Sequence, residues 1–145
     1  MAWSPWGFET VGDLELVDAM VYANGNVYVG GNFTRLGASL GKISESGAVL
    51  PFRGTNARVW SLALSGNTLY FGGEFTSVLD PVGPPVPRQR LAAIDIGSGA
   101  LTAWDANIDN GAVYALSAAG GAVHAAGSFT QLGGQVTGGY TPLAP

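Results

Sequence analysis

The segment Leu69-Tyr70-Phe71-Gly72-Gly73-Glu74-Phe75-Thr76 decides the fold of this 145-residue chain, because it recurs twice more in altered form. The other copies read VYVGGNFT over residues 27–34 and VHAAGSFT over residues 123–130. Internal repetition at this spacing is typical of proteins that stack several copies of one small structural unit. The sequence around these copies therefore sets the architecture of the whole chain.

Each repeat begins with two apolar segments joined by a short polar or glycine pair. The repeats align without a gap over twenty-one positions from Val17, Val59 and Val113. The joining pairs are Asn24-Gly25, Gly66-Asn67 and Gly120-Gly121. Such pairs favour β-hairpins, because primed turns need positive φ at their central residues. The glycine pair inside the second segment, relaxed to Ala126-Gly127 in the third repeat, predicts a bulge or a close approach between neighbouring sheets.

The second half of the repeat predicts two further strands. Third strands begin at Leu40 and Leu91, and fourth strands cover residues 48–52 and 100–104, each ending in an aromatic residue. The repeat length is 42 residues from the first copy to the second and 54 from the second to the third. One repeat is thus a four-stranded antiparallel meander, with the size and content of a β-propeller blade.

The chain resembles the uncharacterised bacterial β-propeller repeats that carry the pattern (V/L)Y-x-GG-x-FT followed by RLA-x-(I/L)D. The second repeat matches this pattern best, through residues 69–76 and 90–95. The first repeat lacks the Arg and Asp of the third strand, and His124 replaces the Tyr in the third repeat. The resemblance implies an all-β propeller in a large secreted or cell-surface bacterial protein, and it implies no defined activity.

The repeat boundaries predict one domain over residues 1–145. Its parts are an outer strand with a linker (1–16), blade 1 (17–58), blade 2 (59–112) and a partial blade 3 (113–145). Met1-Ala2-Trp3 aligns with Thr102-Ala103-Trp104, so the N-terminal segment is expected to be a fourth strand. Residues 139–143, which include Tyr140, lie where a third strand should begin, so the last blade is expected to lack its outermost strand.

Three blades are too few for a ring, since propellers contain about four to eight. We expect the chain to form a homodimer in which each N-terminal strand completes the third blade of its partner. The product is a six-bladed ring without open strand edges. Because this contact joins different surfaces, another oligomer or a filament is an alternative, and so is an excerpt of a larger propeller.

Composition argues against several functional classes. The chain is 47% hydrophobic and 11% charged, which is the composition of a folded domain. Its six Lys and Arg are scattered along the sequence and its net charge is −4, which argues against nucleic-acid binding. Without cysteine it has no disulfide and no thiolate chemistry. The sequence predicts neither a signal peptide nor membrane insertion, because no basic-then-apolar leader and no apolar run of about 18 residues occurs.

Arg88 and Arg90 are the candidate ligand-binding residues. Residues 79–88 form an insertion between the second and third strands of blade 2, and loops on a rigid scaffold often carry binding sites. The two arginines could then bind an anionic or sugar ligand. The alternative, which we favour, is that both pair with neighbouring backbone or carboxylate groups.

Asp105, Asn107 and Asp109 resemble the alternating ligands of a calcium loop, but the glycine comes one place late and the final glutamate is missing. A polar linker turn is therefore preferred, and we expect no metal and no cofactor. His124, the sole histidine, occupies the position of a tyrosine in the other repeats. An aromatic filler is favoured there over a metal ligand or a general base.

A catalytic site has little support in the sequence. A glycosidase needs two carboxylates, and the candidates are Asp13, Glu15, Asp18, Glu74, Asp95 and Asp109. Their spacing selects no pair, and Asp18 and Glu74 are expected to be exposed to solvent. We expect a non-catalytic structural or ligand-binding module at the cell surface or outside the cell, with a carbohydrate or protein ligand. The alternative is a glycan-acting enzyme whose channel site is assembled only in the oligomer.

Overall fold

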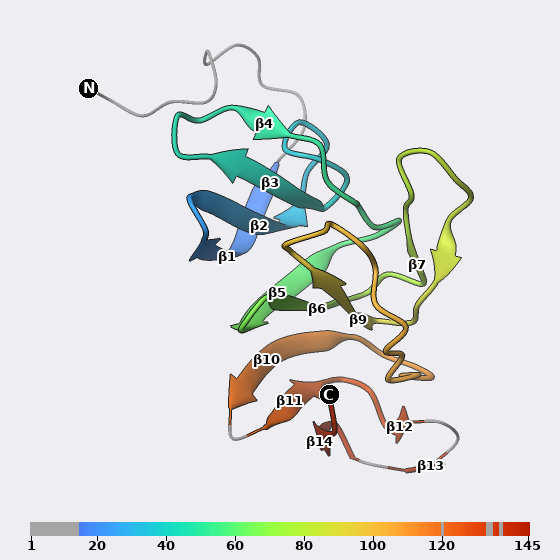
Figure 1. The fold of residues 1–145 in the computed structure, drawn as a ribbon. Helices are drawn as coiled ribbons and strands as arrows, with labels where there is room; N and C mark the ends of the chain where they lie inside the picture. The colour runs from blue at the N-terminus through green and yellow to red at the C-terminus, as the bar shows by residue number, and fades with distance from the viewer. Residues whose placement is uncertain (1–14, 120, 133–134, 137) are drawn as a thin grey trace.

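The computed structural model describes residues 15–119, 121–132, 135–136 and 138–145, and all regular structure in these residues is β-strand (Figure 1). The all-β prediction is therefore confirmed. The strands form three main antiparallel sheets, one from each repeat. The expected outer strand near the N-terminus falls in residues 1–14, outside the described residues.

The sheets follow the repeat boundaries. The first sheet contains β1 (Leu16–Ala23), β2 (Asn26–Asn32), β3 (Leu40–Ser44) and β4 (Val49–Leu50). The second sheet contains β5 (Val59–Ser65), β6 (Thr68–Gly73) and β9 (Leu91–Asp95), with a side hairpin of β7 (Ser77–Val78) and β8 (Val86–Pro87). The third sheet contains β10 (Val113–Ala119), β11 (Ala122–Gly127) and β14 (Tyr140–Leu143), with a side hairpin of β12 (Gln131–Leu132) and β13 (Gln135–Val136).

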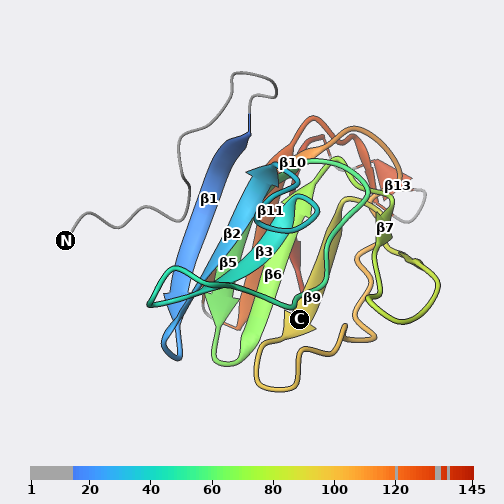
Figure 2. The same ribbon diagram turned by 90° about the horizontal axis from the view of Figure 1, so that it is seen from above.

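The three sheets stack face to face in chain order, with the second sheet in the middle (Figures 1 and 2). Strand β5 lies against β1 and β2, and strand β10 lies against β5 and β6. In the described residues this is an open stack and not a closed ring. The first and third sheets therefore each have one face without a neighbouring sheet.

Apolar side chains from facing sheets form the core between them. Between the first and second sheets, Tyr28 and Leu40 are buried with Leu62, Phe71 and Ile94. Between the second and third sheets the buried cluster is Ala63, Tyr70, Ala93 and Val123. Since strand residues alternate between faces, the buried positions on both sides of the second sheet explain its nearly continuous apolar sequence.

The hairpin between β1 and β2 turns as the sequence predicts. Asn24 and Gly25 have φ of 52° and 77°, the two positive values that a type I′ turn needs. This turn twists in the same sense as the flanking strands, so the hairpin registers without strain. The expected primed turn at Asn24-Gly25 is confirmed.

A bulge recurs at the same point of every repeat, which confirms the prediction made from the glycine pairs. The pairing register shifts at Asp18 in β1, at Trp60 in β5 and at Tyr114 in β10. The extra residue lies on the first strand, opposite the glycine pair of the second strand. The bulge thus turns one side chain per sheet away from the regular alternation.

The glycines opposite the bulges allow two close approaches. A Cβ on Gly31 or Gly73 would lie 1.9 or 2.0 Å from a backbone oxygen of the preceding strand segment. A Cβ on Gly30 or Gly72 would lie 2.7 or 2.5 Å from a valine methyl of the next sheet. The first glycine of each pair therefore sets the spacing between sheets, and the second sets the spacing within one sheet.

The expectation of four strands per blade holds only for the first sheet. In the second sheet the fourth strand is reduced to an isolated bridge between Ile94 and Leu101. The carbonyl of Thr102 accepts a hydrogen bond from Arg88 Nη2 (3.1 Å), so it is used outside the sheet and the strand does not continue. The third sheet has three strands, and the predicted third strand at Tyr140 is confirmed as β14.

Candidate functional site

Arg88, a predicted ligand-binding residue, lies against its own backbone. Its Nη1 donates to the carbonyl of Pro87 (2.8 Å) and its Nη2 to that of Thr102 (3.1 Å). Its Nε is buried and has no hydrogen-bond partner within the described residues. Arg88 therefore links the insertion to the end of the second repeat, and a role in ligand binding stays a prediction.

Arg90 is likewise engaged by the main chain. Its Nε donates to the carbonyl of Gly111 (2.5 Å), and its Nη1 donates to the carbonyl of Ile108 (3.1 Å) and to Gln89 Oε1 (3.0 Å). These contacts hold the segment that leads from the second sheet to the third, residues 108–111, against the start of β9. The two guanidinium groups are thus held on different segments, that of Arg88 at Thr102 and that of Arg90 at residues 108–111.

The insertion of blade 2 forms the side hairpin of β7 and β8, which extends beyond the sheets (Figure 1). Its tip is open: Val82 is 96% exposed. Its base is fixed by an ion pair between Arg53 and Asp80 (3.3 Å) and by a bridge between Thr55 and Val78. A hydrogen bond from the Val82 amide, together with Arg53, holds the pKa of Asp80 below its ordinary value.

The calcium-like segment forms a polar turn. Asp105 Oδ1 accepts the amide of Asn107 (3.0 Å), and Asn107 has a positive φ of 53°. No group of three or more His, Cys, Asp or Glu side chains that could hold a metal ion occurs within the described residues. The hydrogen bond from the Asn107 amide to Asp105 fits the polar linker turn that the sequence favours over a calcium loop at Asp105, Asn107 and Asp109.

His124 lies on the face of the third sheet that no other sheet covers. Its Nδ1 is 2.9 Å from the Tyr140 hydroxyl, and the two rings stack with centroids 6.2 Å apart. Its equivalents Tyr28 and Tyr70 are buried between sheets, and burial raises the pKa of both phenols. The same sequence position is therefore covered in two sheets and open in the third.

Sequence reasoning missed a group of side chains that anchors each Phe-Thr motif. Asn56 Oδ1 accepts the amides of Thr76 (2.9 Å) and Ser77 (3.1 Å), and Asn110 does the same for Thr130 (2.9 Å) in the third repeat. The signal was present, because both asparagines stand three residues before the first valine of a repeat. These amides fasten the end of each second strand to the linker before it.

Glu15 performs this task in the first repeat. Its Oε1 accepts the amide (3.1 Å) and hydroxyl (2.9 Å) of Thr34 and the amide of Arg35 (3.2 Å). Burial acts to raise the pKa of Glu15, but the hydrogen bonds from Thr34 and Arg35 outweigh it and lower the pKa below its ordinary value. This carboxylate is used for structure.

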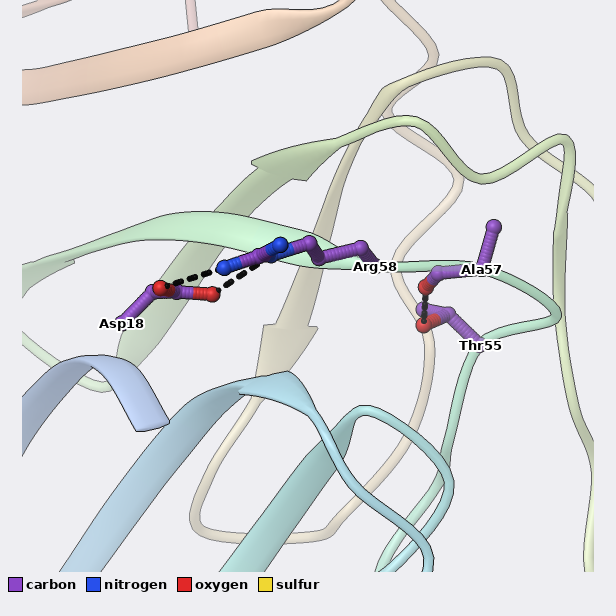
Figure 3. A network of polar contacts seen from close by, with 4 residues as sticks. All are labelled: Asp18, Thr55, Ala57 and Arg58. Carbon is purple, nitrogen blue, oxygen red and sulfur yellow. Dashed lines mark hydrogen bonds and ion pairs between the residues drawn. The ribbon is translucent and has the colours of Figure 1, made fainter. Parts of the chain in front are cut away.

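Asp18 lies at the surface, as the sequence predicts, and its carboxylate is paired with a cation. It receives two hydrogen bonds of 2.8 Å from Arg58, one from Nε and one from Nη2, and these join the first sheet to the second (Figure 3). The Arg58 guanidinium also lies 3.6 Å from the centre of the Trp60 ring. The prediction that Asp18 is exposed to solvent is confirmed, but the sequence did not show that its carboxylate pairs with Arg58 across the two sheets.

The outer face of the first sheet is exposed and apolar along β1, at Val17, Met20 and Tyr22. On the same face, Val29 and Ile43 of β2 and β3 are buried. Val17 is 49% exposed and Met20 is 71% exposed. Their equivalents in the second sheet, Val59 and Leu62, are 0% and 8% exposed because they pack on the first sheet. Tyr22 is exposed as well, and its hydroxyl donates to Glu45 Oε1.

The outer face of the third sheet, defined by His124, Ala126 and Tyr140, is the other open surface. Tyr140 is 55% exposed, whereas Leu91, which holds the same register position in the second sheet, is 0% exposed. Ala126 replaces the glycine that meets a valine in the other sheets. Large apolar side chains at both ends of the stack are the feature that a single soluble domain would normally bury.

No helix long and apolar enough to cross a membrane occurs among the residues that the structure describes.

Comparisons with known proteins name no family. No family model matches the chain, and no curated protein matches it. One similar solved structure is the crystal structure of the computationally designed Ika4 protein. It has 16% sequence identity and a TM-score of 0.44, with 99% of this chain and 100% of that chain covered. A similarity this distant supports no conclusion about function.

Proposed function

We propose that this chain is a non-catalytic structural or ligand-binding β-propeller module that assembles with copies of itself. The observation that carries the proposal is the exposure of Met20, 71%, against 8% for its buried equivalent Leu62. A face that is buried inside the stack and open at its end is what an incomplete stack presents. Covering it with another copy removes apolar surface from water, which drives association.

The form we propose is a six-bladed ring made by two chains. In this ring the N-terminal segment of each chain adds a fourth strand to the third sheet of its partner. Strand β14 has the same place in its sheet as β3 and β9 have in theirs. The outer edge of β3 pairs with β4, and that of β9 forms the bridge to Leu101. A fourth strand beside β14 would therefore match the other two sheets. Ring closure leaves few strand edges open to aggregation.

The ligand would be a carbohydrate or a protein surface, and the module would belong to an extracellular or cell-surface bacterial protein. This part rests on the resemblance of residues 69–76 and 90–95 to bacterial propeller repeats. A glycan-acting enzyme is the weaker alternative, because it needs two available carboxylates. Glu15, Asp18 and Asp95 each bind amide or guanidinium groups of their own chain.

Native mass spectrometry of the full chain tests the proposal. We expect a dimer at micromolar concentration, and a folded monomer as the main species would contradict self-assembly. Deletion of residues 1–8 tests strand exchange separately. We expect this variant to dissociate or aggregate, and an unchanged dimer would rule out exchange while leaving self-assembly standing.

A further inference from the structure

The two outer faces have the same residue positions as the two internal interfaces. Inside the chain, Val59 packs on Gly30, and Val113 packs on Gly72 in the same way one repeat later. At the open ends, the valine position is Val17 and the glycine position is Ala126. A third contact of this kind cannot form within one chain, because the two residues lie on opposite ends of the stack (Figure 1).

We propose that the outer face of the first sheet of one copy docks on the outer face of the third sheet of a second copy, with Val17 placed on Ala126. This assignment rests on the proposed self-assembly and adds which surfaces meet and in what register. The contact is head-to-tail, because its two sides are different surfaces. It therefore closes into a ring or continues as a filament, depending on the rotation between copies.

Shape is consistent with this register. In the internal interfaces, a Cβ built on Gly30 lies 3.3 Å from the Cβ of Val59, and one built on Gly72 lies 3.0 Å from the Cβ of Val113. An actual Cβ, as in Ala126, needs a slightly larger separation between the sheets. The large side chains around it, Met20 on one face and Tyr140 on the other, supply apolar surface to fill that wider interface.

Polar groups at the bulges also complement each other. Inside the chain, the bulge residue of each sheet lies beside that of the next, as Trp60 and Tyr114 show with ring centroids 5.5 Å apart. The docked copy would bring Asp18 of the second chain beside Tyr114 of the first. Tyr114 is 48% exposed, so its hydroxyl is accessible and can donate a hydrogen bond to that carboxylate. The docked contact therefore gives the Asp18 carboxylate a donor across the interface in addition to Arg58.

Engineered cysteines test the register directly, because the chain has none of its own. A disulfide forms where Cβ atoms lie about 3.5–4.5 Å apart, which is the separation expected between Val17 and Ala126 of two copies. The variant that carries Val17→Cys and Ala126→Cys, treated with oxidised glutathione, should give a covalent dimer or a ladder of larger species on a non-reducing gel. Each single variant should stay unlinked. The matched control is Val82→Cys with Ala126→Cys, which also should stay unlinked because Val82 lies at the exposed hairpin tip.

The outcomes separate this inference from the proposed function. Linkage by Val17→Cys alone or by Ala126→Cys alone means that like faces meet, and it overturns the register while self-assembly stands. An oligomer in native mass spectrometry without linkage of the double variant overturns the register in the same way. A monomer throughout overturns both proposals.

A second variant probes the spacing without new chemistry. Ala126→Gly recreates the glycine of the internal interfaces and lets the valine approach more closely. We expect the dissociation constant between copies to fall by about tenfold, the size expected when a tight contact of this kind is relieved. Weaker association of this variant would overturn the placement of Val17 on Ala126.

Discussion

The first and second sheets place a bulge at the same point, but the extra residue is Asp18 in one and Trp60 in the other. The glycines opposite the bulges make equally close approaches in both sheets, 1.9 and 2.0 Å for a Cβ added to Gly31 and Gly73. The backbone path at the bulge therefore depends on glycine at these two positions, whereas the bulge position itself accepts different residues. What differs is how each sheet is joined to its neighbours.

The join between the first and second sheets contains a charged pair, and the join between the second and third has aromatic and neutral polar contacts at that position. Asp18 and Arg58 connect the first two sheets, with the guanidinium stacked on Trp60. The equivalent position in the next join holds the aromatic edge contact of Trp60 with Tyr114 and a hydrogen bond from the Leu116 amide to Ser61 Oγ (3.1 Å). One join should therefore respond to salt and the other should not.

The largest expected effect comes from the shared backbone contact. Gly31→Ala and Gly73→Ala should each lower the free energy of unfolding by about 3 kcal/mol, because the new Cβ meets a backbone oxygen that cannot move without shifting a strand. Urea denaturation at one fixed protein concentration measures this. The control is Gly25→Ala, where nothing lies within 4 Å and only the positive φ opposes the change, at about 1–2 kcal/mol. A clearly different loss of unfolding free energy for Gly31→Ala and Gly73→Ala would show that the two sheets do not share the same backbone contact.

A smaller effect should appear at the charged join. Arg58→Gln removes both bonds to Asp18 and the contact with Trp60, and we expect a loss of about 1 kcal/mol for this partly exposed pair. The loss should shrink in about 1 M NaCl, which screens the pair in the unmodified chain. Ser61→Ala at the other join removes a neutral hydrogen bond to the Leu116 amide, so it should cost about 1 kcal/mol without changing the salt dependence of stability. The same salt response in the Arg58→Gln variant as in the unmodified chain would argue against the ion pair.

The smallest effect separates Glu15 from Asn56, which hold the Phe-Thr motif in the first and second repeats. The lowered pKa of Glu15 means that its stabilising bonds are present above its ordinary value of 4.5 and are lost as the pH falls through the lower folded value. We expect the hydrogen-exchange protection of the Thr34 amide to fall on acidification, with little change at Thr76. Glu15→Gln should remove this pH response. Parallel loss of protection at Thr34 and Thr76 would instead indicate unfolding of the whole stack.

The sequence predicted the strands well where a pattern repeats. Strand β14 and the turn at Asn24-Gly25 were expected from alignment and turn chemistry, because both depend on local residues. The fourth strand of the second repeat was overestimated, since a distant arginine takes the carbonyl of Thr102. The partner of Asp18 was missed for a similar reason: it lies forty residues further along the chain.

The candidate ligand-binding residues also show the difference between what local sequence predicts and what distant contacts decide. The sequence singled out Arg88 and Arg90 by their place near an insertion, and the structure holds each of them on backbone carbonyls of different segments. The repeat count predicts two uncovered faces, but no local pattern marks Met20 as exposed, because Met20 and Leu62 occupy equivalent positions and are both apolar. Only the position of each sheet in the stack makes one exposed and the other buried.

By itself the sequence determined the repeat, the hairpins and the points of close approach, since turns and glycine contacts depend on residues near in the chain or equivalent between copies. The tertiary structure alone decided which apolar face is covered, which carboxylate has a cation and which strand is cut short. These depend on groups brought together from distant segments, whose distances no local pattern encodes. The first and third sheets differ from the second mainly in whether another sheet covers each face, and that is decided only when the chain folds.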